Sequence, residues 1–163
     1  MKWSSNSMVW GRPLSSIFSI FNKKLLPFTY GHLKSKDSVI IEQDLITKNK
    51  KISTFIEYQN FLKKNNIILD HDQRKKKILK QFESICFTKN YKKIFDKNLI
   101  EEVVNIVDRP NVILINFDKN YLEIPKEIII STLQNHQKYF PLFDNQNRLT
   151  NFFLVVANKP DSK

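Results

Sequence analysis

Glycine, cysteine and long apolar runs are scarce in this 163-residue sequence. Gly11 and Gly31 are the two glycines, which excludes a glycine-rich loop of the kind that cradles phosphate. Cys86 is the single cysteine, which excludes an internal disulfide and suits a reducing compartment. Apolar runs fall short of the roughly 20 residues that a membrane helix needs, and the opening segment shows no signal-peptide pattern. These absences favour a cytoplasmic protein with no membrane contact.

Catalytic and metal-binding patterns are also missing from the sequence. The three histidines, His32, His71 and His136, lie far apart and have neither Cys-x-x-Cys nor His-Glu-x-x-His spacing beside them. Asp70 and Asp72 form a carboxylate pair, but at a predicted helix start they favour capping of free backbone N–H groups. We therefore expect no catalytic residue, no metal site and no cofactor on this chain.

What the sequence has in abundance is apolar residues and positive charge. Apolar residues make up 41% and aromatic residues 12%, which favours a folded domain with a real core. The net charge of +11 favours a polyanionic partner such as nucleic acid. A second explanation stays open, because Lys, Asn, Ile and Phe all have A/T-rich codons. A genome of low G+C content enriches these four residues without selection for RNA binding.

The pattern of the first fifty residues predicts little regular structure. Pro13 at a first helical turn predicts a helix that runs through Phe21. Residues 25–30 form a predicted strand. The charged region 31–51 reads as irregular, with a short strand at residues 39–41.

Later segments predict helices interleaved with strands. Thr54 with Glu57 is a capping box, and a second helix start lies at Asp70. We also expect a third helix at residues 99–107 and a strand covered on both faces at residues 112–117. A further helix is expected after Pro125, at residues 126–136, and a hairpin at residues 139–157. The predicted fold is α+β, a single domain over residues 1–158 of amphipathic helices on a small mixed sheet, with a terminal tail at 159–163.

The helix that begins near Asp70 carries the strongest basic pattern. Ile78, Leu79, Phe82, Ile85 and Cys86 form its predicted inner face, and Arg74 to Lys77 with Lys80 form its outer face. A row of cations on a helix can neutralise an RNA backbone, and Tyr91 offers a ring for stacking. An ordinary solvated face is the alternative. The RNA-contact candidates are Arg74, Lys75, Lys77, Lys80, Lys92 and Lys93.

A longer ordered pattern supplies a family resemblance. The segment His136-Gln137-Lys138-Tyr139-Phe140-Pro141 follows a predicted helix, and a strand ending in Val156-Ala157-Asn158 comes after it. Together with Arg12-Pro13 near the start, it resembles the β subunit of the bacterial tetrameric glycyl-tRNA synthetase. The family's Thr-Arg-Gly-His-Arg-Phe motif is replaced here by residues 36–41. The family protein is several times longer, so this chain is expected to be an internal fragment, either excised or encoded by a broken gene.

The resemblance implies a function in glycylation of tRNA without chemistry on this chain. In that family a separate α subunit supplies ATP, Mg and the adenylation site. The implied partners are this α subunit, tRNA and the remaining β-subunit domains, and the implied fold resembles a B3/B4-like synthetase module. A free-standing RNA-binding or scaffold module is the alternative, and an editing-type hydrolase ranks last because no nucleophile cluster is present. The corner His136–Pro141 has two interpretations, a structural turn or a contact with tRNA or a neighbouring domain.

Overall fold

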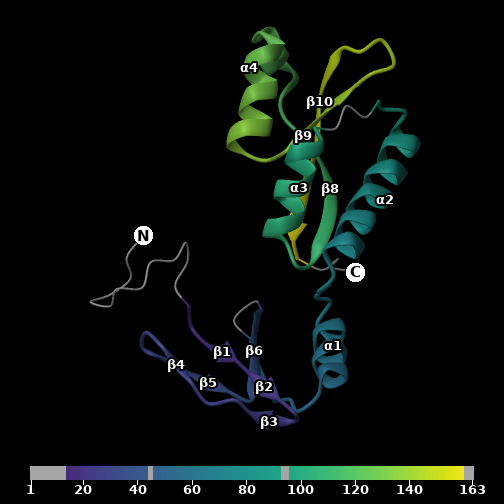
Figure 1. Ribbon diagram of the computed structural model, residues 1–163. Coiled ribbons are helices and arrows are strands. Elements are labelled where there is room, and N and C mark those ends of the chain that lie inside the picture. Colours follow the sequence, from purple (N-terminus) through teal and green to yellow (C-terminus); the bar gives the residue numbers. More distant parts are fainter. Residues whose placement is uncertain (1–13, 44–45, 93–95, 160–163) are drawn as a thin grey trace. The chain divides into compact units, whose positions relative to one another are not determined.

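The computed structural model describes residues 14–43, 46–92 and 96–159. Contacts within the chain group into two compact units, Met1–Asn65 and Asn66–Lys163, where the sequence favoured one domain over residues 1–158. We call them the N-terminal unit and the C-terminal unit. The α+β class is confirmed, since a run of strands is followed by a run of helices and then by a further small sheet (Figure 1).

In its described residues, the N-terminal unit is built from short strands and one helix. Its strands are β1 (Ile17–Phe18), β2 (Ile20–Phe21), β3 (Lys24–Leu25), β4 (Thr29–Tyr30), β5 (Leu33–Lys36), β6 (Ser38–Gln43) and β7 (Ile46–Lys51), and the helix is α1 (Phe55–Lys64). β1 pairs parallel with β5, while β2–β3, β4–β5 and β6–β7 are antiparallel hairpins.

The helix predicted from Pro13 through Phe21 is wrong, because β1 and β2 occupy this segment. Asn22 and Lys23 follow with φ of 46° and 63°. Two successive left-handed residues suit a two-residue hairpin turn and cannot continue a right-handed helix. The prediction that residues 31–51 are irregular is also wrong, since β5, β6 and β7 occupy residues 33–36, 38–43 and 46–51. The short strand predicted at 39–41 lies inside β6.

α1 begins as its capping box predicts. The Thr54 hydroxyl accepts a hydrogen bond from Glu57 N at 3.2 Å, and the Glu57 carboxylate accepts one from Ser53 N at 2.8 Å. These bonds satisfy N–H groups that a helix start leaves without a partner. Phe61 and Leu62 are buried on the inner face of α1.

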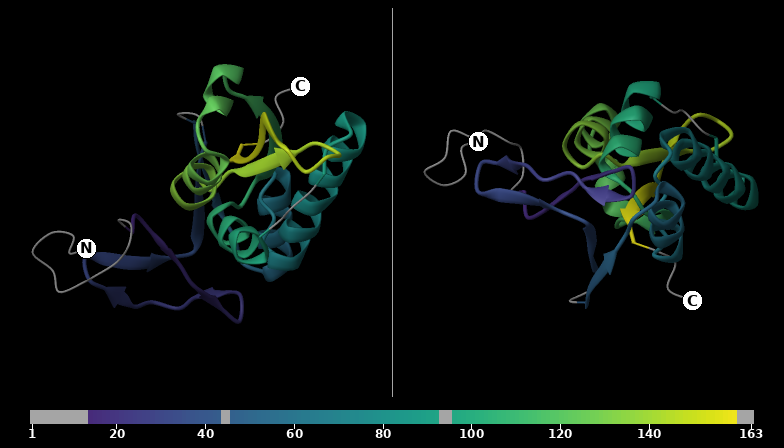
Figure 2. Two further views of the ribbon diagram at one scale, coloured as in Figure 1. Left: turned by 90° about the horizontal axis from the view of Figure 1, so that it is seen from above. Right: turned by 60° about the horizontal axis from the view of Figure 1, so that its bottom comes forward.

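The C-terminal unit is a three-stranded antiparallel sheet with helices on both faces. Its helices are α2 (His71–Lys89), α3 (Lys97–Ile106) and α4 (Lys126–Ser131), with a 3₁₀ turn at Lys119–Glu123 and a π-helical turn at Thr132–His136. The sheet order is β8-β10-β9, from β8 (Pro110–Asn116), β10 (Leu149–Asn158) and β9 (Phe140–Phe143). Figure 2 shows α2 and α4 on opposite sides of β10.

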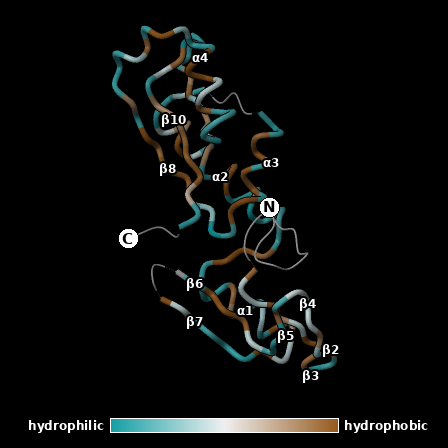
Figure 3. Tube along the Cα trace, turned by 90° about the vertical axis from the view of Figure 1, so that its left-hand side faces the viewer, coloured by the Kyte–Doolittle hydropathy of each residue, from teal (hydrophilic) through white to brown (hydrophobic). Residues whose placement is uncertain are grey.

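The main core lies between the sheet and the pair α2 and α3. Phe82 of α2, Val104 of α3 and Leu154 of β10 are fully buried in it. The predicted inner face of α2 is confirmed, with Ile78, Phe82 and Cys86 buried and Leu79 and Ile85 partly so. In Figure 3 the traces of β8 and β10 are largely hydrophobic in colour, as strands beneath this core require.

One feature of β8 differs from the sequence prediction. The strand was expected to be covered on both faces, but Ile113 and Ile115 remain 41% and 39% exposed. β8 is an edge strand of the sheet, and its core-facing residues are Val112 and Leu114. A run of apolar residues therefore did not mean burial on both faces here.

The predicted hairpin of β9 and β10 is confirmed. Asp144 Oδ1 accepts hydrogen bonds from Gln146 N and Arg148 N at 2.8 and 2.9 Å, and Asn147 has a φ of 59°. Pro141 lies in β9, where its missing N–H is tolerated because β9 is the other edge strand.

Candidate nucleic-acid interface

α2 carries the basic candidates, and its ends are fixed by local chemistry. Asp70 caps the start, because its carboxylate accepts a hydrogen bond from Gln73 N at 2.7 Å. Asn90 ends the helix in the left-handed conformation with a φ of 57°. The carboxylate pair Asp70 and Asp72 therefore lies at a helix start, as the capping interpretation requires.

Arg74 is engaged inside the protein. Its Nε donates a hydrogen bond to the carbonyl oxygen of Val104 at 3.1 Å, and its Nη1 donates to those of Ile68 and Leu69 at 2.8 and 2.9 Å. The guanidinium thus joins the start of α2 to the end of α3. This arrangement gives Arg74 a structural role, and it leaves few donors of the group for phosphate.

Lys75 is also held by a neighbour. Its Nζ forms an ion pair with Glu101 of α3, and His71 Nε2 lies 3.4 Å from the other Glu101 oxygen. Glu101 therefore draws two α2 side chains towards α3. Of the predicted cation row, the first two members stabilise the packing of α2 on α3.

The next three lysines along α2 face solvent. Lys76, Lys77 and Lys80 are exposed. Successive residues of an α-helix are rotated by about 100°, so Lys76 and Lys77 lie within about 60° of Lys80 around the axis. We call these three side chains the lysine stripe. The lysine stripe can contact a polyanion. Lys75 is instead paired with Glu101, and Arg74 donates hydrogen bonds to backbone carbonyls.

The rest of the predicted basic patch is divided. Lys92 is exposed and its Nζ donates to Asn147 Oδ1 at 3.1 Å, while Lys93 lies outside the described residues. Tyr91 is half-buried and packs on Phe152 with ring centroids 5.7 Å apart. Burial raises the pKa of the Tyr91 phenol. Tyr91 is therefore a packing residue and a poor platform for a base.

Sequence reasoning missed an exposed aromatic ring on α2. Phe87 is 91% exposed, and it lies two helical turns beyond Lys80. The signal was present in the sequence. Seven residues rotate a helix by about 700°, which places Phe87 about 20° from Lys80 around the axis.

The corner His136–Pro141 combines an exposed turn with a buried end. The turn is π-helical, and Gln137 N and Tyr139 N donate to the carbonyls of Thr132 and Leu133 at 3.2 and 2.8 Å. Lys138 has a φ of 59°, and its Nζ lies 3.0 Å from Glu102.

The remaining members of the motif divide into exposed and buried groups. The side chains of His136 and Gln137 are exposed, whereas Phe140 and Pro141 are buried. The other motif residues, Arg12 and Pro13, lie outside the described residues.

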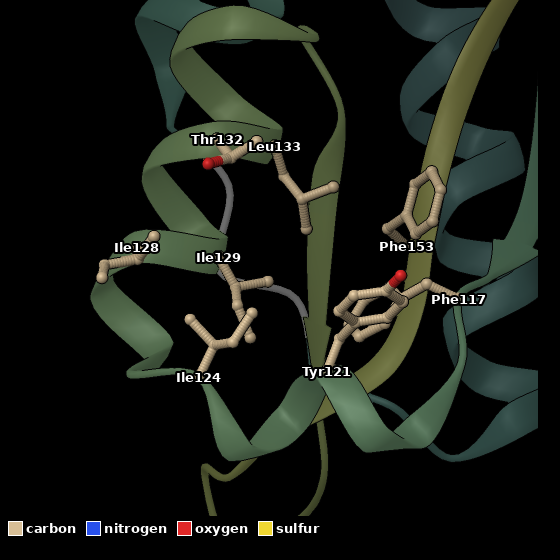
Figure 4. Close-up of a pocket in the computed structure, with 8 residues that line it drawn as sticks. All are labelled: Phe117, Tyr121, Ile124, Ile128, Ile129, Thr132, Leu133 and Phe153. Carbon is tan, nitrogen blue, oxygen red and sulfur yellow. The ribbon is translucent and has the colours of Figure 1, made fainter.

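An apolar pocket adjoins this corner on the face of the sheet opposite α2. Its volume is about 290 Å³. Figure 4 shows the residues around it, with Phe153 of β10 facing α4 across the space. Tyr139 stacks on Phe153 with centroids 5.2 Å apart, so the motif supports one wall. The lining residues are Phe117, Tyr121, Ile124, Ile128, Ile129, Thr132, Leu133 and Phe153.

Two absences among the described residues bear on other classes of site. Within them, no three His, Cys, Asp or Glu side chains gather closely enough to hold a metal ion. None of the helices in the described part of the chain combines the length and apolarity needed to cross a membrane.

Comparison with known proteins identifies the family. The chain matches the family described as glycyl-tRNA synthetase beta subunit over residues 1–163. It is 35% identical over 160 residues to the glycine–tRNA ligase beta subunit of Rickettsia felis, covering 97% of this chain and 24% of that protein. The chain therefore belongs to the glycyl-tRNA synthetase beta subunit family.

Two further relatives match over a similar length of this chain. The glycine–tRNA ligase beta subunits of Buchnera aphidicola subsp. Acyrthosiphon pisum (strain Tuc7) and Thermodesulfovibrio yellowstonii are 34% and 31% identical over 161 and 158 residues. Each match covers 97% of this chain and 23% of the relative. The chain thus spans about a quarter of the length of the curated relatives it matches.

Proposed function

We propose that this chain is part of a glycine–tRNA ligase β subunit and that the lysine stripe of α2 holds the tRNA backbone. Family membership over residues 1–163 supports the ligase assignment. Lys76, Lys77 and Lys80 are exposed on one side of α2, and this exposure is the observation that carries the RNA contact. Lysines neutralise phosphates and position an RNA without reading its sequence.

In this proposal the chemistry of glycylation takes place elsewhere. A separate α subunit binds ATP and Mg and forms the adenylate, and this chain positions tRNA for it. The remaining β-subunit domains and the α subunit are the protein partners, and the complex acts in the cytoplasm with the translation machinery. We also propose that the fold of the chain resembles a B3/B4 synthetase module.

Binding of tRNA by the chain tests the proposal. The variant Lys76→Gln, Lys77→Gln, Lys80→Gln removes the lysine stripe. The matched control Lys97→Gln, Lys119→Gln, Lys126→Gln removes the same charge from three other exposed lysines of the C-terminal unit. We expect tRNA to bind less tightly to the first variant than to the control. Equal affinities of the two variants would mean that only net charge matters and would overturn the assigned contact.

A free-standing RNA-binding or scaffold module is the second candidate function. The two differ in their protein partner, because a ligase subunit associates with an α subunit. Co-purification with the glycine–tRNA ligase α subunit, in the context of the full β subunit, supports the ligase function. RNA binding without such association supports the free-standing module.

A further inference from the structure

The first two hairpins of the N-terminal unit combine exposed apolar side chains with uncompensated positive charge. Residues 14–36 contain four lysines and no aspartate or glutamate. Three aromatic rings of this segment face solvent, with exposed fractions of 74% for Phe21, 43% for Phe28 and 48% for Tyr30. Leu25 and Leu26 are 41% and 49% exposed beside them. Clustered exposed apolar side chains mark interaction surfaces, whereas single ones do not.

Strand pairing brings one of these rings and a lysine together on one face. In the β2–β3 hairpin, Phe21 is directly opposite Lys24. Side chains in directly opposite positions lie on the same face, with Cβ atoms about 4.5–5.5 Å apart. In the neighbouring hairpin, Tyr30 is directly opposite Leu33, whereas Lys34 is opposite Thr29 and therefore lies on the other face. Lys34 and Lys36 are both exposed and two residues apart, so they share one face of β5.

Hydrogen bonds from Ser35 fix the backbone that carries Phe28. The buried Ser35 hydroxyl accepts a hydrogen bond from Phe28 N at 2.9 Å and donates one to the Leu26 carbonyl at 2.8 Å. Ser35 N also donates to the Phe28 carbonyl at 2.9 Å. These bonds fix the segment between the two hairpins. A ring held on such a backbone loses less entropy on binding than one on a mobile loop.

We infer that this surface, defined by Phe21, Lys24, Phe28 and Tyr30 and called the hairpin surface, binds single-stranded RNA. Aromatic side chains stack on unpaired bases, and lysines beside them contact the phosphates between those bases. A duplex hides its bases in the stack, so rings add nothing to duplex binding. The absence of acidic residues from positions 14–36 favours a polyanion over an apolar protein partner. The inference rests on the proposed function, and it adds an RNA contact in the unit that does not contain α2.

The test measures binding of a fluorescently labelled single-stranded oligoadenylate to the whole chain. The variant Phe21→Ala, Phe28→Ala, Tyr30→Ala is expected to weaken binding by about 5- to 150-fold for each ring that stacks. The control Phe55→Ala, Ile56→Ala removes two apolar side chains of the same unit that are 63% and 69% exposed, and it should leave binding unchanged. The variant Phe21→Trp, Phe28→Tyr keeps a ring at both positions and should keep affinity, so the test survives if the alanine variant fails to fold.

Several results would overturn the inference. They are unchanged affinity in the alanine variant, an equal loss in the Phe55→Ala, Ile56→Ala control, and an RNA duplex that binds as well as the single strand and shows the same loss. Loss of α-subunit association with oligoadenylate binding intact would assign the surface to a protein partner instead. The lysine-stripe variant separates the two proposals. If it loses tRNA while the alanine variant does not lose oligoadenylate, the hairpin surface fails and the proposed function stands.

Discussion

Phe82 of α2 and Phe140 of β9 meet edge to face, with ring centroids 4.8 Å apart and ring planes at 66°. Both rings are almost completely buried, at 0% and 1% exposed. Phe140 comes from the family motif, and Phe82 comes from the helix that carries the lysine stripe. The motif therefore anchors α2 to the sheet, and its buried end has a structural role.

Replacement of Phe140 should destabilise the C-terminal unit strongly. The change Phe140→Ala removes a fully buried ring and leaves a cavity, which costs about 3–5 kcal/mol of unfolding free energy. Urea unfolding followed by circular dichroism measures it. The control Phe87→Ala removes an equal volume from a ring that is 91% exposed and should change stability by less than about 0.5 kcal/mol. Similar effects of the two substitutions would contradict the packing described for Phe140.

Arg74 should behave as a structural residue. The change Arg74→Met removes the donor from the part-buried carbonyls of Ile68 and Val104 and from the exposed carbonyl of Leu69, and the loss should cost about 1 kcal/mol or more of unfolding free energy. Lys77→Met, three residues along the same helix, is the matched control and should leave stability nearly unchanged. A fall in tRNA affinity with no change in unfolding free energy would instead place the Arg74 guanidinium on RNA.

Acid should destabilise the fold partly through Asp144. The backbone N–H of Arg148 is the largest cause that holds the pKa of Asp144 below its ordinary value of 3.8, with the Arg148 side chain and Gln146 N adding to it. A carboxyl group whose pKa is lower in the folded state stabilises the fold above its unfolded pKa. This contribution is lost as pH falls through the folded pKa.

The variant Asp144→Asn carries no such charge, so its stability should vary less with pH below about 4 than that of the parent. Urea midpoints recorded between neutral and strongly acidic pH give the comparison. Glu57, whose pKa is lowered chiefly by the Ser53 N–H, predicts the same behaviour for the N-terminal unit. Parallel pH profiles of parent and variant would show that the turn bonds of Asp144 carry no pH-dependent stability.

The chain by itself should not form glycyl-adenylate. Its sequence has two glycines and no glycine-rich phosphate loop, and the proposal gives adenylation to the α subunit. ATP–pyrophosphate exchange in the presence of glycine is the measurement, with the α subunit as positive control. Robust exchange by the pure chain would disprove the assignment of this piece as non-catalytic.

Local signals made the helices predictable. The capping patterns at Thr54 and Asp70 each span four consecutive residues, so the local sequence contains the whole signal. Both caps are present in the structure. The N-terminal strands were not predictable in this way. β1 and β2 are two residues each, and β1 is held by pairing Ile17 with Ser35, a contact that no local pattern encodes.

Contacts between residues distant in sequence also decided which of the predicted RNA-contact residues face solvent. Arg74 and Lys80 both fall on the predicted outer face of one helix, yet Arg74 donates to Val104, thirty residues away, and Lys80 faces solvent. Charge and periodicity identify a basic face but cannot tell which of its cations tertiary contacts will occupy. Phe87 is the opposite case, because helical periodicity alone would have placed its ring on the outer side of α2. Tyr91, the ring selected from the sequence, packs on Phe152 instead.

The salt dependence of tRNA binding tests the central claim, that the lysine stripe contacts the RNA backbone, most directly. Each phosphate contact contributes roughly 0.7–0.9 to the slope of log K against log salt concentration. The parent and the variant Lys76→Gln, Lys77→Gln, Lys80→Gln are titrated with several tRNAs over a range of salt concentrations. Our account predicts a shallower slope for the variant by about one such increment per lost contact, with the same loss for every tRNA. Identical slopes would show that the stripe is a solvated surface, and a loss confined to glycine tRNA would show base reading that this face is not expected to perform.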